Sequence, residues 1–140
     1  MSPASPPSSG TPALYYGSEW GISGEKAPCS DAGLRPALEK PEWNALTSWI
    51  ARLAAARRGS PALREGSYRN VLLTNLQLIF ERRTETERVL VAVNADSQPY
   101  TAHFDAGCGL AWDLISGQQH DFGGGSQLPP YSAFFWKMER

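Results

Sequence analysis

The spacing of apolar residues divides this chain into a helical stretch and a following β-rich stretch. In residues 41–58, apolar side chains recur at three- and four-residue steps, at Trp43, Leu46, Trp49, Ile50 and Leu53. This spacing is typical of one apolar helix face. Pro41 suits a first helical position, whereas Gly59 suits the residue after a helix and Pro61 prevents its continuation. The pattern therefore predicts a helix over Pro41–Arg58, with Trp43 and Trp49 in a core.

From Gly66 onward the hydrophobic period changes to that of strands. The predicted strands are Tyr68–Thr74, Leu76–Arg82, Val89–Asn94, Tyr100–Asp105, Leu110–Ile115 and Ala133–Met138. Turn residues separate them at near-regular intervals, which is typical of an antiparallel β-sandwich. We expect the core to be formed mostly by Val71, Leu73, Leu76, Leu78, Phe80, Leu90, Val91, Val93, Leu114, Phe134 and Trp136. Trp112 is expected in the core as well, and the fold class is mainly β.

The first 40 residues hold one short apolar run between polar and glycine-rich segments. Residues 1–9 are rich in proline and serine, and such a composition predicts a disordered leader. Residues 13–16 form an unbroken apolar run that Gly17 stops, as in a strand covered on both faces. Residues 17–40 are predicted to be a loop, and loops of this length are usually functional or disordered.

Composition and charge exclude several classes of function. The formal net charge is −1, and the basic residues are dispersed, which argues against nucleic-acid binding. No apolar run approaches the roughly 20 residues of a membrane-spanning helix, and no signal-peptide pattern is present. Cys29 and Cys108 lack metal-ligand spacing, so we expect no metal or cofactor. The two cysteines could form a single disulfide, but we expect two reduced thiols in a cytoplasmic protein.

Five short segments in a fixed order carry a resemblance to a known family. They are Gly10-x-Pro-Ala-Leu-Tyr-Tyr-Gly-Ser-Glu19, Arg35–Leu38, Pro61-Ala-Leu-x-x-Gly-x-Tyr68, Val89–Asn94 and Asp113–Gly117. Their order resembles the end of the α-amylase family of glycoside hydrolases (glycoside hydrolase family 13), and most resembles neopullulanases, maltogenic amylases and cyclomaltodextrinases. The resemblance implies that residues 10–65 are the last strand, loop and helix of a (β/α)8 barrel. Residues 66–140 would then be the C-terminal all-β sandwich domain.

The same resemblance implies that the catalytic carboxylates come from earlier barrel strands. Their motifs do not occur in this chain, and His103 and His120 do not replace the family's substrate-binding histidines. We therefore expect no catalytic residue here and no hydrolysis by the chain alone. Glu19 and Glu25 are expected to be loop-supporting or solvated acids, and Tyr15 and Tyr16 are expected to pack in barrel layers.

One binding pattern of the family can be carried over to this sequence. The family often has an Asp four residues before an Arg in the loop after the eighth strand, and the pair binds sugar hydroxyls. Here the pattern falls on Asp31 and Arg35, although the family's usual proline after the Asp is Ala32. The alternative for the pair is an ordinary salt bridge within the loop. Trp20 is a third candidate, because an aromatic ring can stack on a pyranose. The expected partner of the complete enzyme is an α-glucan oligosaccharide.

Two other functions remain open at this point. The sandwich could be a non-catalytic carbohydrate-binding module, which would need two or more exposed aromatic residues in one line. The candidates are Tyr100, Phe104, Trp112, Phe122, Tyr131, Phe134, Phe135 and Trp136. The chain could also be a truncated gene product without a function of its own.

Overall fold

The computed structural model describes residues 11–38 and 40–138. Within the described residues, residues 11–55 form a first compact unit and residues 56–138 form a second. The helical elements are the 3₁₀ turns η1 (Ser18–Trp20) and η2 (Ala32–Leu34) and the helices α1 (Ala45–Gly59) and α2 (Pro61–Glu65). The strands are β1 (Ser67–Leu73), β2 (Gln77–Arg83), β3 (Arg88–Asn94), β4 (Tyr100–Ala102), β5 (Leu110–Asp113), β6 (Gln119–Asp121), β7 (Ser126–Leu128) and β8 (Ser132–Met138). The leader predicted over residues 1–9 lies outside the described residues.

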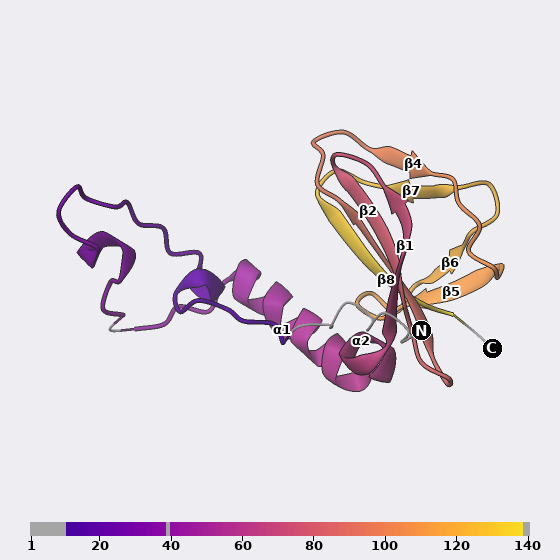
Figure 1. Cartoon of the computed structure of the whole chain (residues 1–140), viewed down its shortest axis with the longest axis horizontal. Coiled ribbons are helices and arrows are strands. Elements are labelled where there is room, and N and C mark those ends of the chain that lie inside the picture. The colour runs from indigo at the N-terminus through magenta and orange to yellow at the C-terminus, as the bar shows by residue number, and fades with distance from the viewer. Residues whose placement is uncertain (1–10, 39, 139–140) are drawn as a thin grey trace, which may run out of the picture. The chain divides into compact units, whose positions relative to one another are not determined.

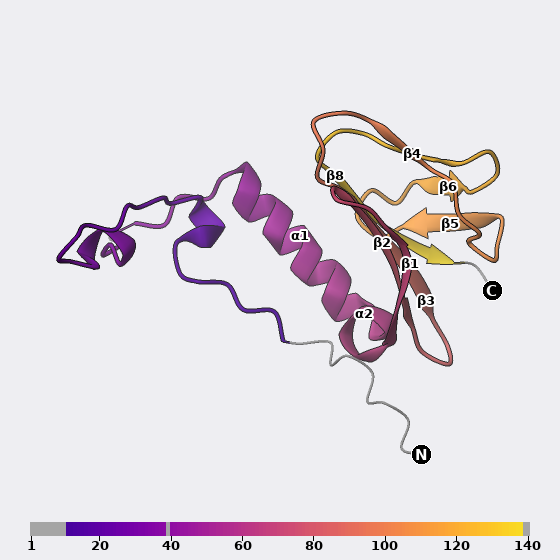
Figure 2. The same ribbon diagram turned by 45° about the horizontal axis from the view of Figure 1, so that its top comes forward.

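The second unit is an antiparallel β-sandwich, so the predicted mainly-β fold class is confirmed (Figure 1). One sheet has six strands in the order β1-β2-β3-β8-β5-β6, and the other pairs β4 with β7. Their shared core joins Ile79 and Leu90 of the large sheet to Ala102 of β4 and Leu128 of β7. Figure 2 shows β4, β5 and β6 from a second direction.

All six predicted strands occur, but sequence reasoning missed β6 and β7. These two strands have three residues each, Gln119–Asp121 and Ser126–Leu128. Their sequences are mostly polar and too short to show a hydrophobic period. They exist because they pair with β5 and β4, and neither pairing leaves a local signal in the sequence.

The core lies in the sandwich, as predicted, but only some of the residues predicted for it are buried. Leu90, Val91 and Trp136 are buried, whereas Leu73 and Leu76 are exposed beside the β1–β2 turn. The other six residues of the predicted set are half-buried. Trp112 is 42% exposed, so its expected place in the core was wrong. It follows Ala111 on β5, and in a strand adjacent side chains point to opposite faces, so burying Ala111 leaves Trp112 outside.

The helix α1 begins four residues later than predicted, at Ala45. Asn44 stops it from starting earlier, because its side-chain oxygen accepts a hydrogen bond from the Thr47 amide (3.0 Å), which is N-cap geometry. Trp43 therefore precedes the helix and is 67% exposed, and Trp49 is 36% exposed. Their expected place in a core was wrong, because the described part of their unit has no sheet or second α-helix to cover them.

Residues 13–16 do not form the predicted strand. Leu14, Tyr15 and Tyr16 are all exposed, and no described segment pairs with this run. A strand exists only through its ladder of hydrogen bonds to a neighbour. Without a partner, an apolar run of high strand propensity stays irregular.

Pro61 starts a second helix rather than only ending the first. Ser60 is its N-cap and accepts a hydrogen bond from the Leu63 amide. The same hydroxyl donates to the buried carboxylate of Glu87 (2.8 Å), which also accepts from the Ala62 amide and pairs with Lys137. Glu87 thereby fixes α2 on the sheet, where Ala62 and Leu63 cover the face opposite the main core.

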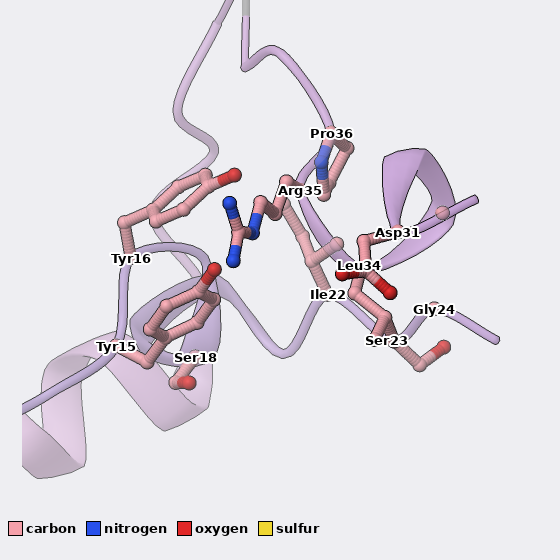
Figure 3. A pocket seen from close by; sticks show the side chains of 11 residues that line it. Tyr15, Tyr16, Ser18, Ile22, Ser23, Gly24, Asp31, Leu34, Arg35 and Pro36 are labelled. Atoms are coloured by element: carbon pink, nitrogen blue, oxygen red, sulfur yellow. The ribbon is translucent and has the colours of Figure 1, made fainter. Parts of the chain in front are cut away.

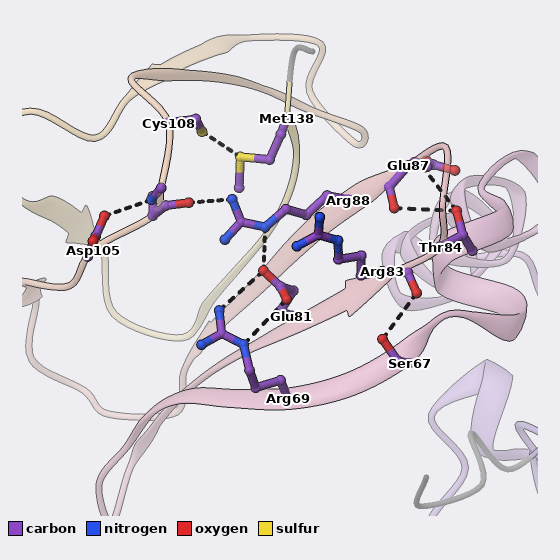
Figure 4. Close-up of polar contacts among 12 residues, drawn as sticks. Ser67, Arg69, Glu81, Arg83, Thr84, Glu87, Arg88, Asp105, Cys108 and Met138 are labelled. Atoms are coloured by element: carbon purple, nitrogen blue, oxygen red, sulfur yellow. Dashed lines mark hydrogen bonds and ion pairs between the residues drawn. The ribbon is translucent and has the colours of Figure 1, made fainter.

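A second buried carboxylate ties the sheet together through two arginines (Figure 4). Glu81 on β2 accepts hydrogen bonds from Arg69 on β1 and from Arg88 on β3, and Arg88 also donates to the carbonyl oxygen of Ala106. Burial acts to raise the pKa of Glu81, but the two guanidinium groups outweigh it and hold the pKa below its ordinary value. The carboxylate therefore stays charged and paired.

Cys29 and Cys108 are both free thiols. None of the helices within residues 11–38 and 40–138 is long and apolar enough to cross a membrane. In the same part of the chain no group of three or more His, Cys, Asp or Glu side chains could hold a metal ion.

Asn94 is a buried, hydrogen-bonded polar residue of the sandwich. Its side chain is 1% exposed, and its amide nitrogen lies 3.0–3.1 Å from the carbonyl oxygens of Gln98, Leu128 and Pro129. We predict that Asn94→Ala lowers the free energy of unfolding by about 3 kcal/mol, because buried carbonyl groups lose their donor. Urea unfolding followed by circular dichroism measures this. Ser97→Ala, on the same loop, is the control, and an Asn94→Ala loss no larger than the control's contradicts the prediction.

His120 is a partly buried titratable group of the sandwich. Its ring stacks on Trp136 at 4.2 Å between centroids and contacts the Ser126 hydroxyl at 2.8 Å. Burial lowers the pKa of His120, although the charge of Asp121 acts in the opposite direction. The unfolded imidazole binds a proton near pH 6.5, whereas the folded one resists protonation.

We therefore predict that the free energy of unfolding decreases as pH falls from about 7.5 to about 5.5. His120→Gln should flatten this dependence, whereas His103→Gln should leave it unchanged. Urea unfolding at a series of pH values measures the slope. An equal slope in the wild type and in His120→Gln would show that His120 is not the responsible group.

Candidate functional site

A cavity of about 390 Å³ lies entirely within the first unit (Figure 3). It is lined by Tyr15, Tyr16, Ser18, Ile22, Ser23, Gly24, Asp31, Gly33, Leu34, Arg35 and Pro36. All of these residues belong to the stretch from the apolar run to the end of the glycine-rich loop. The loop is therefore folded around a hollow, and two of the three predicted binding residues line it.

Backbone hydrogen bonds and two glycines shape this loop. The Ser18 amide donates to the Tyr15 carbonyl (3.0 Å), and the Ile22 amide donates to the Gly17 carbonyl (3.0 Å), which closes the turn that contains η1. Further along, Gly24 and Gly33 lie against each other. A Cβ atom added to Gly24 would lie 2.0 Å from the Gly33 carbonyl oxygen, so no side chain fits at Gly24. The close approach folds the loop back on itself.

Asp31 and Arg35 flank η2 and share the cavity without pairing. The Asp31 carbonyl accepts from the Leu34 amide (2.9 Å), which forms the 3₁₀ turn between them. The carboxylate of Asp31 pairs instead with Lys26, at 3.9 Å between the charged atoms, and both side chains are exposed. Lys26 was not among the binding-site residues that the sequence predicted. Exposed pairs of this kind contribute little to stability, so both groups remain available to a ligand.

Arg35 is directed toward two tyrosines on the opposite wall (Figure 3). The rings of Tyr15 and Tyr16 lie 4.9 Å apart between centroids at 43°. Partial burial and the neighbouring Tyr15 raise the pKa of Tyr16, and the charge of Arg35 acts in the opposite direction. The expected packing of these tyrosines inside barrel layers does not occur in this chain. Both side chains line the cavity wall instead, and the raised pKa keeps Tyr16 a protonated phenol.

The third candidate, Trp20, does not line the cavity. It is half-buried, and its ring meets Trp43 edge to face at 6.4 Å. Glu19 is half-buried and Glu25 is exposed, and neither lines the cavity. Among the lining residues Asp31 is the one carboxylic acid. A retaining glycosidase needs two carboxyl groups about 5–5.5 Å apart, so the cavity has groups for binding sugar hydroxyls but not a catalytic pair.

Exposed aromatic residues on the sandwich do not form a binding face. Of the eight candidates, Tyr131 is 75% exposed and Trp112 is 42% exposed, whereas the other six are half-buried or buried. Trp112 lies on β5 and Tyr131 precedes β8 in a turn, so no single strand carries two of them. This arrangement gives the binding-module alternative no support.

Comparison with known proteins shows what the chain resembles. No protein-family model matches it. It is 31% identical over 121 residues to the cyclomaltodextrin glucanotransferase of Bacillus sp. (strain 38-2), a match that covers 84% of this chain and 16% of the relative. The cyclomaltodextrin glucanotransferase of Niallia circulans is 32% identical over 122 residues, with the same coverage. The chain thus spans about one-sixth of the length of these relatives.

Among solved structures, CldA, a cyclomaltodextrin glucanotransferase with a three-domain ABC distribution, matches with a TM-score of 0.75 and 24% identity. The match covers 91% of this chain and 29% of CldA. At this identity it is the fold that the two proteins share.

The contact between Gly24 and Gly33 gives a direct test of how the loop is built. We predict that Gly24→Ala opens it, because the new Cβ cannot be accommodated at 2.0 Å from a backbone oxygen. Tryptic cleavage after Lys26 should then become about tenfold faster. Gly59→Ala is the matched control, since an added Cβ there meets nothing within 4 Å. Equal cleavage rates in the two variants would argue against the close approach.

Proposed function

Because this chain belongs to the α-amylase family of glycoside hydrolases (glycoside hydrolase family 13), we propose that it is the C-terminal portion of an enzyme that acts on α-glucans of the maltodextrin or cyclodextrin type. The observation that carries the proposal is the 31% identity to a cyclomaltodextrin glucanotransferase over 84% of this chain. The sandwich in the described residues supports the same assignment, because the fold matches that of CldA.

The proposal gives the two parts of the chain different tasks. Residues 10–65 would supply the last strand, loop and helix of a barrel, and residues 66–140 the domain that supports it. In such barrels, function lies on the loops after the strands. The loop that holds the cavity follows residues 13–16, the run that would become the last barrel strand.

Within this loop we assign sugar binding to Asp31 and Arg35. A carboxylate accepts hydrogen bonds from adjacent sugar hydroxyls, and a guanidinium donates to ring and hydroxyl oxygens. Both side chains are exposed and line one cavity, and neither pairs with the other. Trp20 stays a weaker candidate, because its ring contacts Trp43 rather than the cavity.

We place catalysis outside this chain, since Asp31 is the one carboxylic acid among the residues that line the cavity. The structural relative AmyP has been solved with maltotriose, so an α-glucan oligosaccharide is the ligand class to test. The two free cysteines agree with a cytoplasmic location, which we propose together with the function.

A chimaera tests the assignment of function. The matching C-terminal segment of the Bacillus sp. (strain 38-2) glucanotransferase is replaced by residues 11–138 of this chain. We expect the chimaera to form cyclodextrins from starch, whereas this chain alone shows no turnover. Asp31→Ala and Arg35→Ala in the chimaera should each raise KM for maltodextrin about tenfold, the loss of one charge-assisted hydrogen bond.

The matched control is Lys26→Gln, which removes the ion-pair partner of Asp31 but leaves both proposed sugar-binding groups in place. It should change KM less than twofold. An active chimaera whose KM is unchanged by both Ala substitutions would refute the sugar-binding assignment. A folded but inactive chimaera would refute the proposed function itself.

A further inference from the structure

The residues at the start of α1 form a reciprocal hydrogen-bonded cap. The Thr47 amide donates to the side-chain oxygen of Asn44 (3.0 Å), and the Asn44 amide donates to the Thr47 hydroxyl (3.3 Å). Such a pair satisfies two backbone donors that a helix start leaves open. Thr47 is 5% exposed and is the one buried residue of α1.

Both side chains have a second contact, far away in the sequence. The Thr47 hydroxyl lies 2.7 Å from the carbonyl oxygen of Glu19, and the Asn44 side-chain nitrogen lies 2.9 Å from the carbonyl oxygen of Trp20. The hydroxyl has a single proton to donate, and Glu19 is its nearer acceptor, since the Asn44 oxygen lies at 3.1 Å. Two side chains from one helix start therefore hold two consecutive carbonyl groups.

These carbonyl groups belong to the turn that shapes the cavity. Glu19 and Trp20 are the last two residues of η1, and Ser18 and Ile22 on either side of them line the cavity. A three-residue 3₁₀ turn satisfies few of its own carbonyl groups, and its geometry is weak on its own. Because the donors on α1 supply these bonds, the shape of one cavity wall depends on the helix start.

We propose that Asn44 and Thr47 are positioning residues that hold the η1 turn in the conformation in which the sugar-binding cavity forms. The ligand class, an α-glucan oligosaccharide, rests on the proposed function. The positioning itself rests on the four hydrogen bonds that join the helix start to η1 and complete the cap. Neither residue contacts the ligand, since neither lines the cavity.

Three variants of the full chain separate positioning from helix capping. Asn44→Asp keeps the oxygen that caps Thr47 but loses the donor to Trp20, and aspartate is a good N-cap. Thr47→Val keeps the branched shape but loses both the donor to Glu19 and the acceptor for the Asn44 amide, and Thr47→Ser restores the hydroxyl that makes both bonds. Asn44→Asp, which keeps both bonds of the cap, is therefore the variant that separates the two roles. Ser48→Ala is the matched control. It removes the hydrogen bond from the Trp43 ring nitrogen to Ser48 (2.7 Å) but keeps the hydrogen bonds from Asn44 and Thr47 to η1.

Hydrogen exchange read by mass spectrometry gives the first result. In Asn44→Asp and Thr47→Val, amides in residues 15–22 should exchange about tenfold faster, while those in residues 50–58 stay unchanged. Thr47→Ser should restore the slow exchange, and Ser48→Ala should keep it. Unchanged exchange in residues 15–22, or equal acceleration in residues 50–58, would overturn the proposal, since the residues would then only cap the helix.

Maltotriose binding to the same proteins, followed by NMR titration, gives the second result. The Kd of Asn44→Asp and of Thr47→Val should rise about tenfold relative to the wild type, and that of Ser48→Ala should not change. If exchange in residues 15–22 became faster but the Kd for maltotriose did not change, the proposal that the helix start shapes the binding cavity would be wrong. Should the wild type bind no maltotriose, the sugar-binding assignment fails, whereas the exchange result still decides the positioning of η1.

Discussion

The sandwich depends on the burial of one indole, that of Trp136. It lies in β8, between β3 and β5, and is 1% exposed. Phe134 and His120 stack on it at 5.4 and 4.2 Å between centroids, and Phe122 meets it edge to face at 5.3 Å. The ring therefore joins β8 to β6 and to the segment after β6. Removing such a side chain costs about 3–5 kcal/mol, a large part of the stability of a small domain.

Buried polar groups decide how the loops of the sandwich are attached. Asn94, Glu87 and Asp113 are all nearly inaccessible, and each binds backbone or side-chain groups of a separate segment. Asp113, for example, accepts hydrogen bonds from the amides of Ser116 and Phe135. A buried polar group without a hydrogen-bond partner lowers the stability of the fold. Each of these residues therefore favours the one loop conformation that supplies its partners. Apolar packing stabilises the sandwich, and these polar groups determine how its loops are attached to the strands.

The cavity of the first unit is stabilised differently. Its backbone has few ladder hydrogen bonds, and its apolar residues are mostly exposed. Its shape comes instead from close backbone contact at Gly24 and Gly33 and from side chains at the start of α1. Such a loop can present Asp31 and Arg35 on one surface without pairing them. This is the arrangement that a polyhydroxylated ligand requires, because a paired carboxylate and guanidinium would satisfy each other.

The sequence by itself determined the mainly-β fold, the six predicted strands, and the family to which the chain belongs. It also placed Asp31 and Arg35 in one loop. The fold class and the strands depend on near neighbours and their spacing, whereas the family and the Asp31 and Arg35 pattern came from the resemblance of short motifs. Tertiary structure decided the rest. It created β6 and β7 from polar residues, left residues 13–16 without a strand, and paired Asp31 with Lys26. It also exposed Trp43 and Trp49 and started α1 at Ala45. The physical reason is common to these cases: a strand, a buried ring or an ion pair needs a partner, and local sequence does not say which distant segment supplies it.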